Sequence, residues 1–171
     1  MLVDRAGAYD AGHRLSAATI RPIVPYFICP NCKRRVVDSD RRDGLTHQPV
    51  GCSACGFGFL FELLEDYYPG PNTGFVVCDG NLRILAVGRG ILELTGYPEH
   101  ELFGKTIAEA FGVKADNGDN PAELAVEWGV RRLDQPLTIA MRSGTEREIT
   151  ADFFPAYDED GGLLVALSPR M

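Results

Sequence analysis

The apolar positions of residues 75–168 change period twice along the chain. They first form short runs bounded by Gly, Asn and Asp, then recur at the spacing of an amphipathic helix, and finally return to short alternating runs. The predicted elements are a β-hairpin over 75–87, short helices between 91 and 111, a longer helix over 121–133, and strands over 137–142, 146–155 and 163–168. This order predicts an α+β domain over residues 73–171.

Two further segments precede this domain. The sequence LFELLEDYY over 60–68 has apolar residues every three to four positions and is followed by the helix-stopping Pro69-Gly70-Pro71. We therefore expect a linker helix and a Pro/Gly loop over 60–72, with the helix packed on the sheet or on the same helix of a second protomer. The apolar stripe of this helix consists of Leu60, Leu64, Tyr67 and Tyr68. Residues 1–24 have weak helical character and no capping signals, so we expect an arm that is exchanged between protomers or ordered only on binding.

The composition is that of a folded protein, with 45% hydrophobic and 24% charged residues in a chain of 171. Charges interrupt the first twenty residues, and no apolar run approaches the roughly 18 residues of a membrane helix. We therefore expect a cytoplasmic protein without membrane contact. The net charge of −7 is uneven, since residues 1–60 carry +3 and residues 61–171 carry −10.

Four of the five cysteines form two close pairs with the spacing C-x2-C-x19-C-x2-C. Two such turns can bring four thiolates to one ion, which is the arrangement of a tetrahedral zinc site. The expected ligands are Cys29, Cys32, Cys52 and Cys55. Because all four positions are cysteine, no position is left for a catalytic water, and we expect one structural Zn²⁺ per chain. The segment resembles a zinc ribbon in its C-P-x-C and C-x-x-C-G motifs, and we assign the ribbon to residues 25–59.

Other roles for the cysteines are less well supported by the sequence. Two structural disulfides would need an oxidising compartment, and a thioredoxin-like redox pair would need a surrounding βαβ pattern. His47 could replace one ligand, but four thiols are already present. Cys78 lies in a predicted strand, where a lone cysteine is typically a small core residue.

Basic residues cluster between the two cysteine pairs. The candidates for contact with phosphate or a partner are Lys33, Arg34, Arg35, Arg41 and Arg42. Asp38, Asp40 and Asp43 offset part of this charge, and no aromatic residues are interleaved for base stacking. The pattern favours a solvated face or a dock for an acidic protein surface over nucleic-acid binding.

The C-terminal domain resembles a PAS domain. The resemblance rests on the strand, acidic turn and strand at 75–87, on Leu94-Thr95-Gly96-Tyr97, and on Glu101-Leu102-Phe103-Gly104-Lys105, together with the order of the elements. It implies a five-stranded antiparallel sheet with helices on one face, and a sensory or protein-interaction role. Gly88 departs from the family, in which Asn is common at this position.

The resemblance also implies a pocket between the sheet and the helices. Period-two alternation directs six strand residues inward, and four helical residues would face them. These residues fill a closed core or line a ligand pocket: Ile91, Leu94, Leu124, Trp128, Leu137, Ile139, Met141, Ile149, Ala151 and Phe153. The reactive-cysteine motif of flavin-binding PAS domains is missing, and residues 121–133 contain no histidine for haem. The organic ligand is therefore undefined.

No nucleophile elbow, phosphate loop, kinase signature or metal-hydrolase pair occurs, so we expect no enzyme. Because the last predicted strand lies close to residue 171, we expect a stand-alone signalling or regulatory protein. Its PAS domain would sense a small molecule or form a homodimer, and its ribbon or linker helix would bind a partner protein. The alternatives are a transcription-associated protein whose ribbon contacts nucleic acid or the transcription machinery, and a thiol redox sensor that uses the zinc site.

Overall fold

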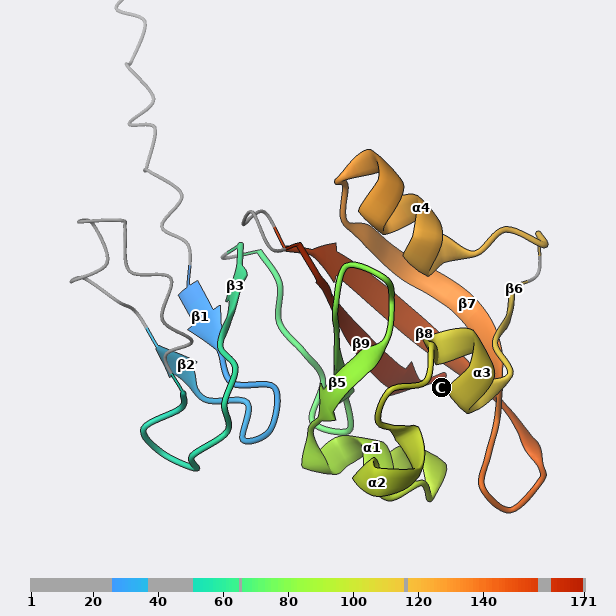
Figure 1. Ribbon diagram of the computed structural model, residues 1–171, viewed down its shortest axis with the longest axis horizontal. Coiled ribbons are helices and arrows are strands. Elements are labelled where there is room, and N and C mark those ends of the chain that lie inside the picture. The colour runs from blue at the N-terminus through green and yellow to red at the C-terminus, as the bar shows by residue number, and fades with distance from the viewer. Residues whose placement is uncertain (1–25, 37–50, 65, 116, 157–160, 171) are drawn as a thin grey trace, which may run out of the picture.

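The computed structural model describes residues 26–36, 51–64, 66–115, 117–156 and 161–170. These residues form a three-stranded sheet near the N-terminal side and a six-stranded sheet covered by helices (Figure 1). Both sheets are antiparallel throughout. The predicted N-terminal arm, residues 1–24, lies outside the described residues. No described helix is long and apolar enough to cross a membrane.

The small sheet consists of β1 (Tyr26–Ile28), β2 (Arg35–Val36) and β3 (Phe61–Leu63), in the order β2-β1-β3. The linker helix expected over 60–68 was wrong, because β3 occupies this segment and pairs with β1. The apolar residues of this segment also fit the alternation of a strand, since Leu63 is buried while the preceding Glu62 is exposed. The backbone N–H and C=O groups of β3 form hydrogen bonds with the free edge of β1. This pairing outweighs the local preference for a helix.

The large sheet has the order β5-β4-β9-β8-β7-β6. Its strands are β4 (Gly74–Cys78), β5 (Ile84–Val87), β6 (Lys114–Ala115), β7 (Arg132–Ala140), β8 (Glu146–Pro155) and β9 (Leu163–Pro169). The helices are α1 (Arg89–Thr95), α2 (Glu99–Leu102), α3 (Ile107–Phe111) and α4 (Pro121–Trp128). The predicted α+β class and antiparallel sheet are confirmed, and the two-residue strand β6 raises the strand number from five to six.

Helix α4 is shorter than the sequence predicted. It ends at Trp128 because Gly129 adopts a left-handed conformation, with φ 62°, and its N–H caps the carbonyl of Ala125. The helix prediction over 121–133 was therefore wrong at its C-terminal end, and Arg132 begins strand β7 instead. Glycine adopts this backbone conformation without steric cost, and the chain turns there toward the sheet.

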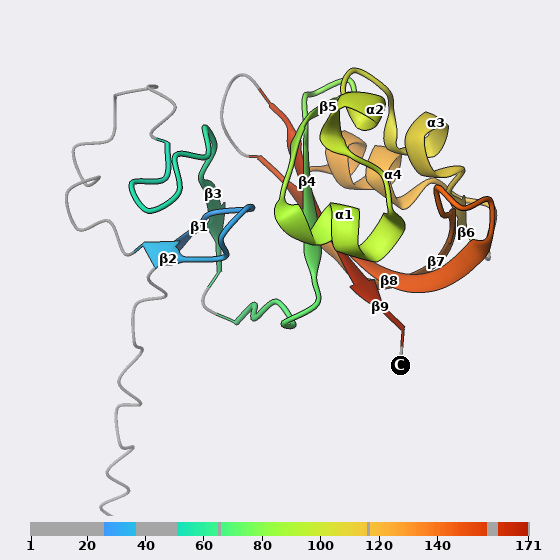
Figure 2. The ribbon, with the colours of Figure 1, turned by 90° about the horizontal axis from the view of Figure 1, so that it is seen from below.

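The large sheet has a buried cluster on each of its faces. The helices cover one face, and the small sheet covers the other face over β5, β4, β9 and part of β8 (Figure 2). The ribbon-side cluster contains Tyr26, Ile28, Leu63, Tyr67, Phe75, Val77, Ala86, Phe154, Leu164 and Ala166. Val76 and Cys78 belong instead to the buried cluster between the sheet and the helices, which is called the helix-side cluster. Burial on both faces explains why β4 and β9 read as continuous apolar runs rather than as alternating patterns.

Candidate metal centre and its contact with the helical layer

The sulfur atoms of four cysteines in the turns between the strands of the small sheet lie close together. Cys29 and Cys32 follow β1, and Cys52 and Cys55 precede β3. Their sulfur atoms all lie within 4.8 Å of one another. The Cys29 and Cys55 sulfurs are 3.6 Å apart, and those of Cys32 and Cys52 are 3.7 Å apart. A disulfide has a bond of about 2.05 Å, whereas a tetrahedral ion with Zn–S bonds of about 2.3 Å separates its ligands by about 3.8 Å. The geometry fits an ion with four thiolate ligands.

Both cysteine pairs adopt the same turn. The N–H of Lys33 donates to the carbonyl of Cys29 at 2.8 Å, and the N–H of Gly56 donates to the carbonyl of Cys52 at 2.8 Å. The residue after each pair has a positive φ, 61° at Lys33 and 75° at Gly56. Glycine meets this requirement in the second turn, while Lys33 pays a conformational cost of about 1–2 kcal/mol in the first. The cysteine spacing thus produces two matching turns, called the first knuckle (residues 29–33) and the second knuckle (residues 52–56).

Neighbouring groups lower the pKa of two of the four cysteines, which favours the thiolate form that binds a cation. The N–H of Phe57 and the side-chain amide of Asn31 donate to the sulfur of Cys55 and lower its pKa to about 6. Backbone N–H groups of Ala54 and Cys55 lower the pKa of Cys52. Burial has the opposite effect on Cys29, whose pKa rises to about 12. A bound cation would compensate the buried charge and favour the thiolate form of every ligand.

The basic residues near the knuckles are largely engaged within the chain. The ammonium group of Lys33 donates to the carbonyl of Pro71 at 2.7 Å. The guanidinium of Arg35 lies 4.1 Å from the ring centres of both Tyr26 and Tyr68, and it donates to the carbonyl of Tyr67 at 2.8 Å. Arg34 is exposed. Arg41, Arg42 and His47 lie outside the described residues. Lys33 and Arg35 thus attach the ribbon to the segment that leads into β4.

Most of the predicted pocket residues lie in the helix-side cluster. The buried members are Ile91, Leu94, Leu137, Ile139, Ile149, Ala151 and Phe153. Met141 is half-buried against this cluster, and Leu124 is half-buried on α4. The inward position predicted for Trp128 was wrong, because 61% of its surface is exposed. Helix α4 buries Pro121, Ala122 and Ala125 instead, and these small residues let the helix lie close to the sheet.

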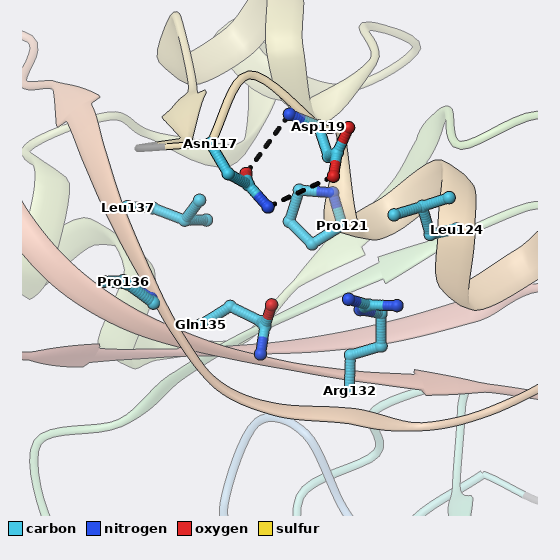
Figure 3. Close-up of a pocket in the computed structure, with 8 residues that line it drawn as sticks. All are labelled: Asn117, Asp119, Pro121, Leu124, Arg132, Gln135, Pro136 and Leu137. Carbon is cyan, nitrogen blue, oxygen red and sulfur yellow. Dashed lines mark hydrogen bonds between the residues drawn. The ribbon is translucent and has the colours of Figure 1, made fainter.

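Two cavities open beside α4. One of about 180 Å³ is shown in Figure 3 and is lined by Asn117, Asp119, Pro121, Leu124, Arg132, Gln135, Pro136 and Leu137. Its Arg132 Nε is buried without a hydrogen-bond partner among the described residues. The second cavity, of about 330 Å³, lies between α3 and the start of α4, and Phe153 is part of its lining. Leu124, Leu137 and Phe153 are therefore the predicted pocket residues that line a cavity.

The contact between the first knuckle and helix α1 was not anticipated. The amide nitrogen of Asn31 donates to the sulfur of Cys55 at 3.6 Å, and its amide oxygen accepts from the N–H of Arg89 at 3.1 Å. A Cβ atom at Gly88 would lie 2.1 Å from the carbonyl oxygen of Pro30. The knuckle therefore occupies the space of a side chain at position 88. The departure from the family's Asn at this position was the one signal of this contact in the sequence.

Comparisons with known proteins agree with this architecture. No protein-family model matches the chain, and neither does any curated protein. Among solved structures, the PAS domain of nitrogen regulation protein NR(II) from Vibrio parahaemolyticus is similar over 59% of this chain and 92% of its own, with a TM-score of 0.50 and 14% identity. The light-state dimer of the fungal blue-light photoreceptor Vivid is similar over 60% of this chain and 81% of its own, with a TM-score of 0.51 and 15% identity.

These likenesses define the fold of the larger unit. The six-stranded sheet and its helices have the PAS fold, as the sequence motifs indicated. The cysteine cluster lies in the unit that precedes it. The chain is therefore a PAS-fold protein with an N-terminal four-cysteine ribbon.

Proposed function

We propose that this chain is a sensory or signalling protein in which one structural Zn²⁺ holds the ribbon on the outer face of the PAS sheet. The observation that carries the proposal is the meeting of four thiols within 4.8 Å, in a unit that shares a buried cluster with that sheet. A small three-stranded sheet buries too little apolar surface to be stable without a cross-link. The ion supplies this cross-link and, with four protein ligands, leaves no open position for catalysis.

The PAS fold supports a sensory role, and the cavities beside α4 are the candidate ligand sites. Cys78 does not fit the role of a flavin-adduct cysteine. Only 2% of its surface is exposed, and burial raises its pKa to about 12. A buried, protonated thiol is a poor nucleophile. We therefore expect no covalent flavin adduct at Cys78.

A homodimer, which we also propose for this protein, needs a surface that the ribbon leaves free. The ribbon occupies the outer face of β4 and β9, where Phe75, Val77 and Leu164 are buried. Large apolar side chains are exposed elsewhere on the described surface: Leu92, Phe103, Trp128 and Val130 lie on or beside helices. We therefore place the dimer or partner contact on the helical side of the domain. The neighbour Vivid is known as a light-state dimer.

A second candidate function is thiol redox sensing at the same cysteines, which is favoured by the exposure of Cys32. Peroxide would oxidise two thiolates to one disulfide and would itself be reduced to water. The ion would lose two ligands and leave the ribbon. Metal that stays fully bound during peroxide treatment would rule out this role.

Native mass spectrometry of the purified chain tests the main proposal. We expect one zinc per chain, lost in Cys29→Ser and Cys52→Ser but retained in the matched control Cys78→Ser. A further non-metal mass that disappears on denaturation would identify a sensor with a bound ligand. Zinc alone would indicate a scaffold for dimerisation or partner binding. A parent protein without stoichiometric metal would contradict the proposed ribbon.

A further inference from the structure

The first knuckle is seated directly on the start of helix α1. The backbone of Pro30 and Asn31 packs against Gly88, where a Cβ would lie 2.1 Å from the Pro30 oxygen and 3.3 Å from the Asn31 Cα. Any side chain at position 88 would displace the knuckle. Gly88 is also the N-cap residue of α1, and it has no side chain to accept a hydrogen bond from the first turn. Helix α1 therefore lacks a cap of its own.

Asn31 provides the missing cap from the ribbon. Its amide oxygen accepts from the N–H of Arg89, the first residue of α1. The nitrogen of the same amide donates to the sulfur of Cys55, which lies in the other knuckle. A single planar group thus joins a candidate metal ligand to the first turn of a PAS helix. Lys33 of the same knuckle donates to the carbonyl of Pro71 and also interacts electrostatically with Glu93 of α1.

Helix α1 carries this contact into the helix-side cluster. Ile91 and Leu94 are buried there, with 0% and 4% of their surfaces exposed. The helix also lies unusually close to β4, since a Cβ at Gly90 would lie 2.8 Å from the carbonyl oxygen of Thr73. At the other end of α1, the N–H of Arg142 donates to the carbonyl of Thr95. A shift of α1 would therefore alter the packing of the PAS core.

From these contacts we propose that Asn31 couples the metal state of the ribbon to helix α1. The proposal rests on metal binding by the four cysteines. With the metal bound, the two knuckles hold Asn31 within hydrogen-bond distance of Cys55, and Asn31 caps α1. When the metal leaves, the first knuckle is no longer held against α1, Asn31 separates from the N–H of Arg89, and the first turn of α1 opens. Coupling between two sites is reciprocal, so a PAS ligand that moves α1 must also change how tightly the ribbon holds its metal. The ribbon would thus report the state of the PAS core.

Hydrogen exchange of the full chain, followed by mass spectrometry with and without a zinc chelator, tests this coupling. Helix α3 is the internal reference, because its N-cap Thr106 and Glu109 form a capping box within the same helix. We expect metal removal to speed exchange in the first turn of α1 about fivefold, the factor typical of a lost cap, and to leave α3 much less affected. Equal acceleration of α1 and α3 would indicate general destabilisation and would overturn the proposal.

Substitutions at Asn31 separate its two contacts. In Asn31→Ala, we expect fast exchange of α1 already in the metal-loaded protein, with one metal per chain retained. Asn31→Asp keeps an acceptor for Arg89 but loses the donor to Cys55, so we expect a protected α1 and faster transfer of metal to the chelator. Ser53→Ala is the matched control, since Ser53 is an exposed residue of the other knuckle.

The outcomes distinguish this proposal from metal binding itself. Metal content is measured on every sample. A parent chain that holds no metal would overturn both proposals. A metal-loaded Asn31→Ala protein whose α1 exchanges like that of the parent would overturn the coupling alone. If Asn31→Ala does not fold, unchanged metal transfer in Asn31→Asp would do the same.

Discussion

The hydroxyl of Tyr67 donates a hydrogen bond of 2.8 Å to the carboxylate of Asp152, and this bond joins the segment after β3 to strand β8 of the PAS sheet. The ring of Tyr67 packs edge-on against Phe154 at 4.6 Å. Its backbone carbonyl accepts from Tyr26 and Arg35 of the ribbon. Burial and the nearby Asp152 raise the pKa of Tyr67, so its hydroxyl stays protonated and donates at neutral pH. Tyr67 thus connects ribbon and sheet through its hydroxyl, its ring and its backbone carbonyl.

Replacing Tyr67 by Phe should weaken this connection without removing the ring. We expect Tyr67→Phe to lower the free energy of unfolding by about 1.5–3 kcal/mol, the range for hydrogen bonds to charged groups. Tyr68→Phe is the matched control, because Tyr68 is 72% exposed and its ring remains available to Arg35. Urea denaturation of both variants measures the difference. Equal midpoints would mean that the Tyr67–Asp152 bond contributes nothing to stability.

Neighbouring leucines distinguish the observed strand from the helix that the sequence predicted. Leu63 is 3% exposed in the ribbon-side cluster, whereas Leu64 is 44% exposed. We expect Leu63→Ala to cost about 2–4 kcal/mol and Leu64→Ala no more than about 0.5 kcal/mol. A helix with its stripe at Leu64 would give the opposite order. Thermal unfolding of the two variants decides between them.

The close approach of α1 to β4 should make Gly90 intolerant of a side chain. A Cβ there would lie 2.8 Å from a backbone oxygen and 2.9 Å from the Cα of Gly74. Because both neighbours are backbone atoms, we expect Gly90→Ala to destabilise the protein by about 1–3 kcal/mol. Gly58→Ala is the control, since no atom lies within 4 Å of a Cβ at that position. Circular dichroism melts that shift equally for both variants would contradict this packing.

Cys78 should make stability fall at alkaline pH. Burial raises its pKa in the folded chain to about 12 from the ordinary value of 9.0. Below about pH 9 the thiol is protonated in both states and contributes no pH dependence. Between about pH 9 and 12 the unfolded chain loses this proton while the folded chain keeps it. The free energy of unfolding therefore decreases by up to about 1.4 kcal/mol per pH unit.

Urea denaturation at a series of pH values from 8 to 10.5 tests this titration. Comparison of the parent chain with Cys78→Ala separates the contribution of Cys78 from that of every other group in the chain. We expect the variant to have a shallower alkaline decline than the parent, whatever its stability at pH 8. Parallel curves for the two proteins would show that Cys78 does not titrate as burial requires.

The sequence by itself determined the features that depend on local spacing. Two C-x2-C turns bring their thiols together because each turn is a short, self-contained structure, and the order of strands and helices identified the PAS fold. Period-two alternation correctly placed Ile139, Ile149 and Phe153 in the core. These inferences need only the geometry of single turns, strands and helices.

The tertiary structure decided the features that depend on contacts between distant segments. Residues 61–63 became a strand because β1 offered an unpaired edge, and Trp128 stayed at the surface because α4 packs through small residues. Gly88 is explained only by the knuckle of Pro30 and Asn31, which lies 57 or more positions earlier in the chain. Local patterns carry no record of such partners, because hydrogen bonding and close packing between separate segments form only when the chain has folded.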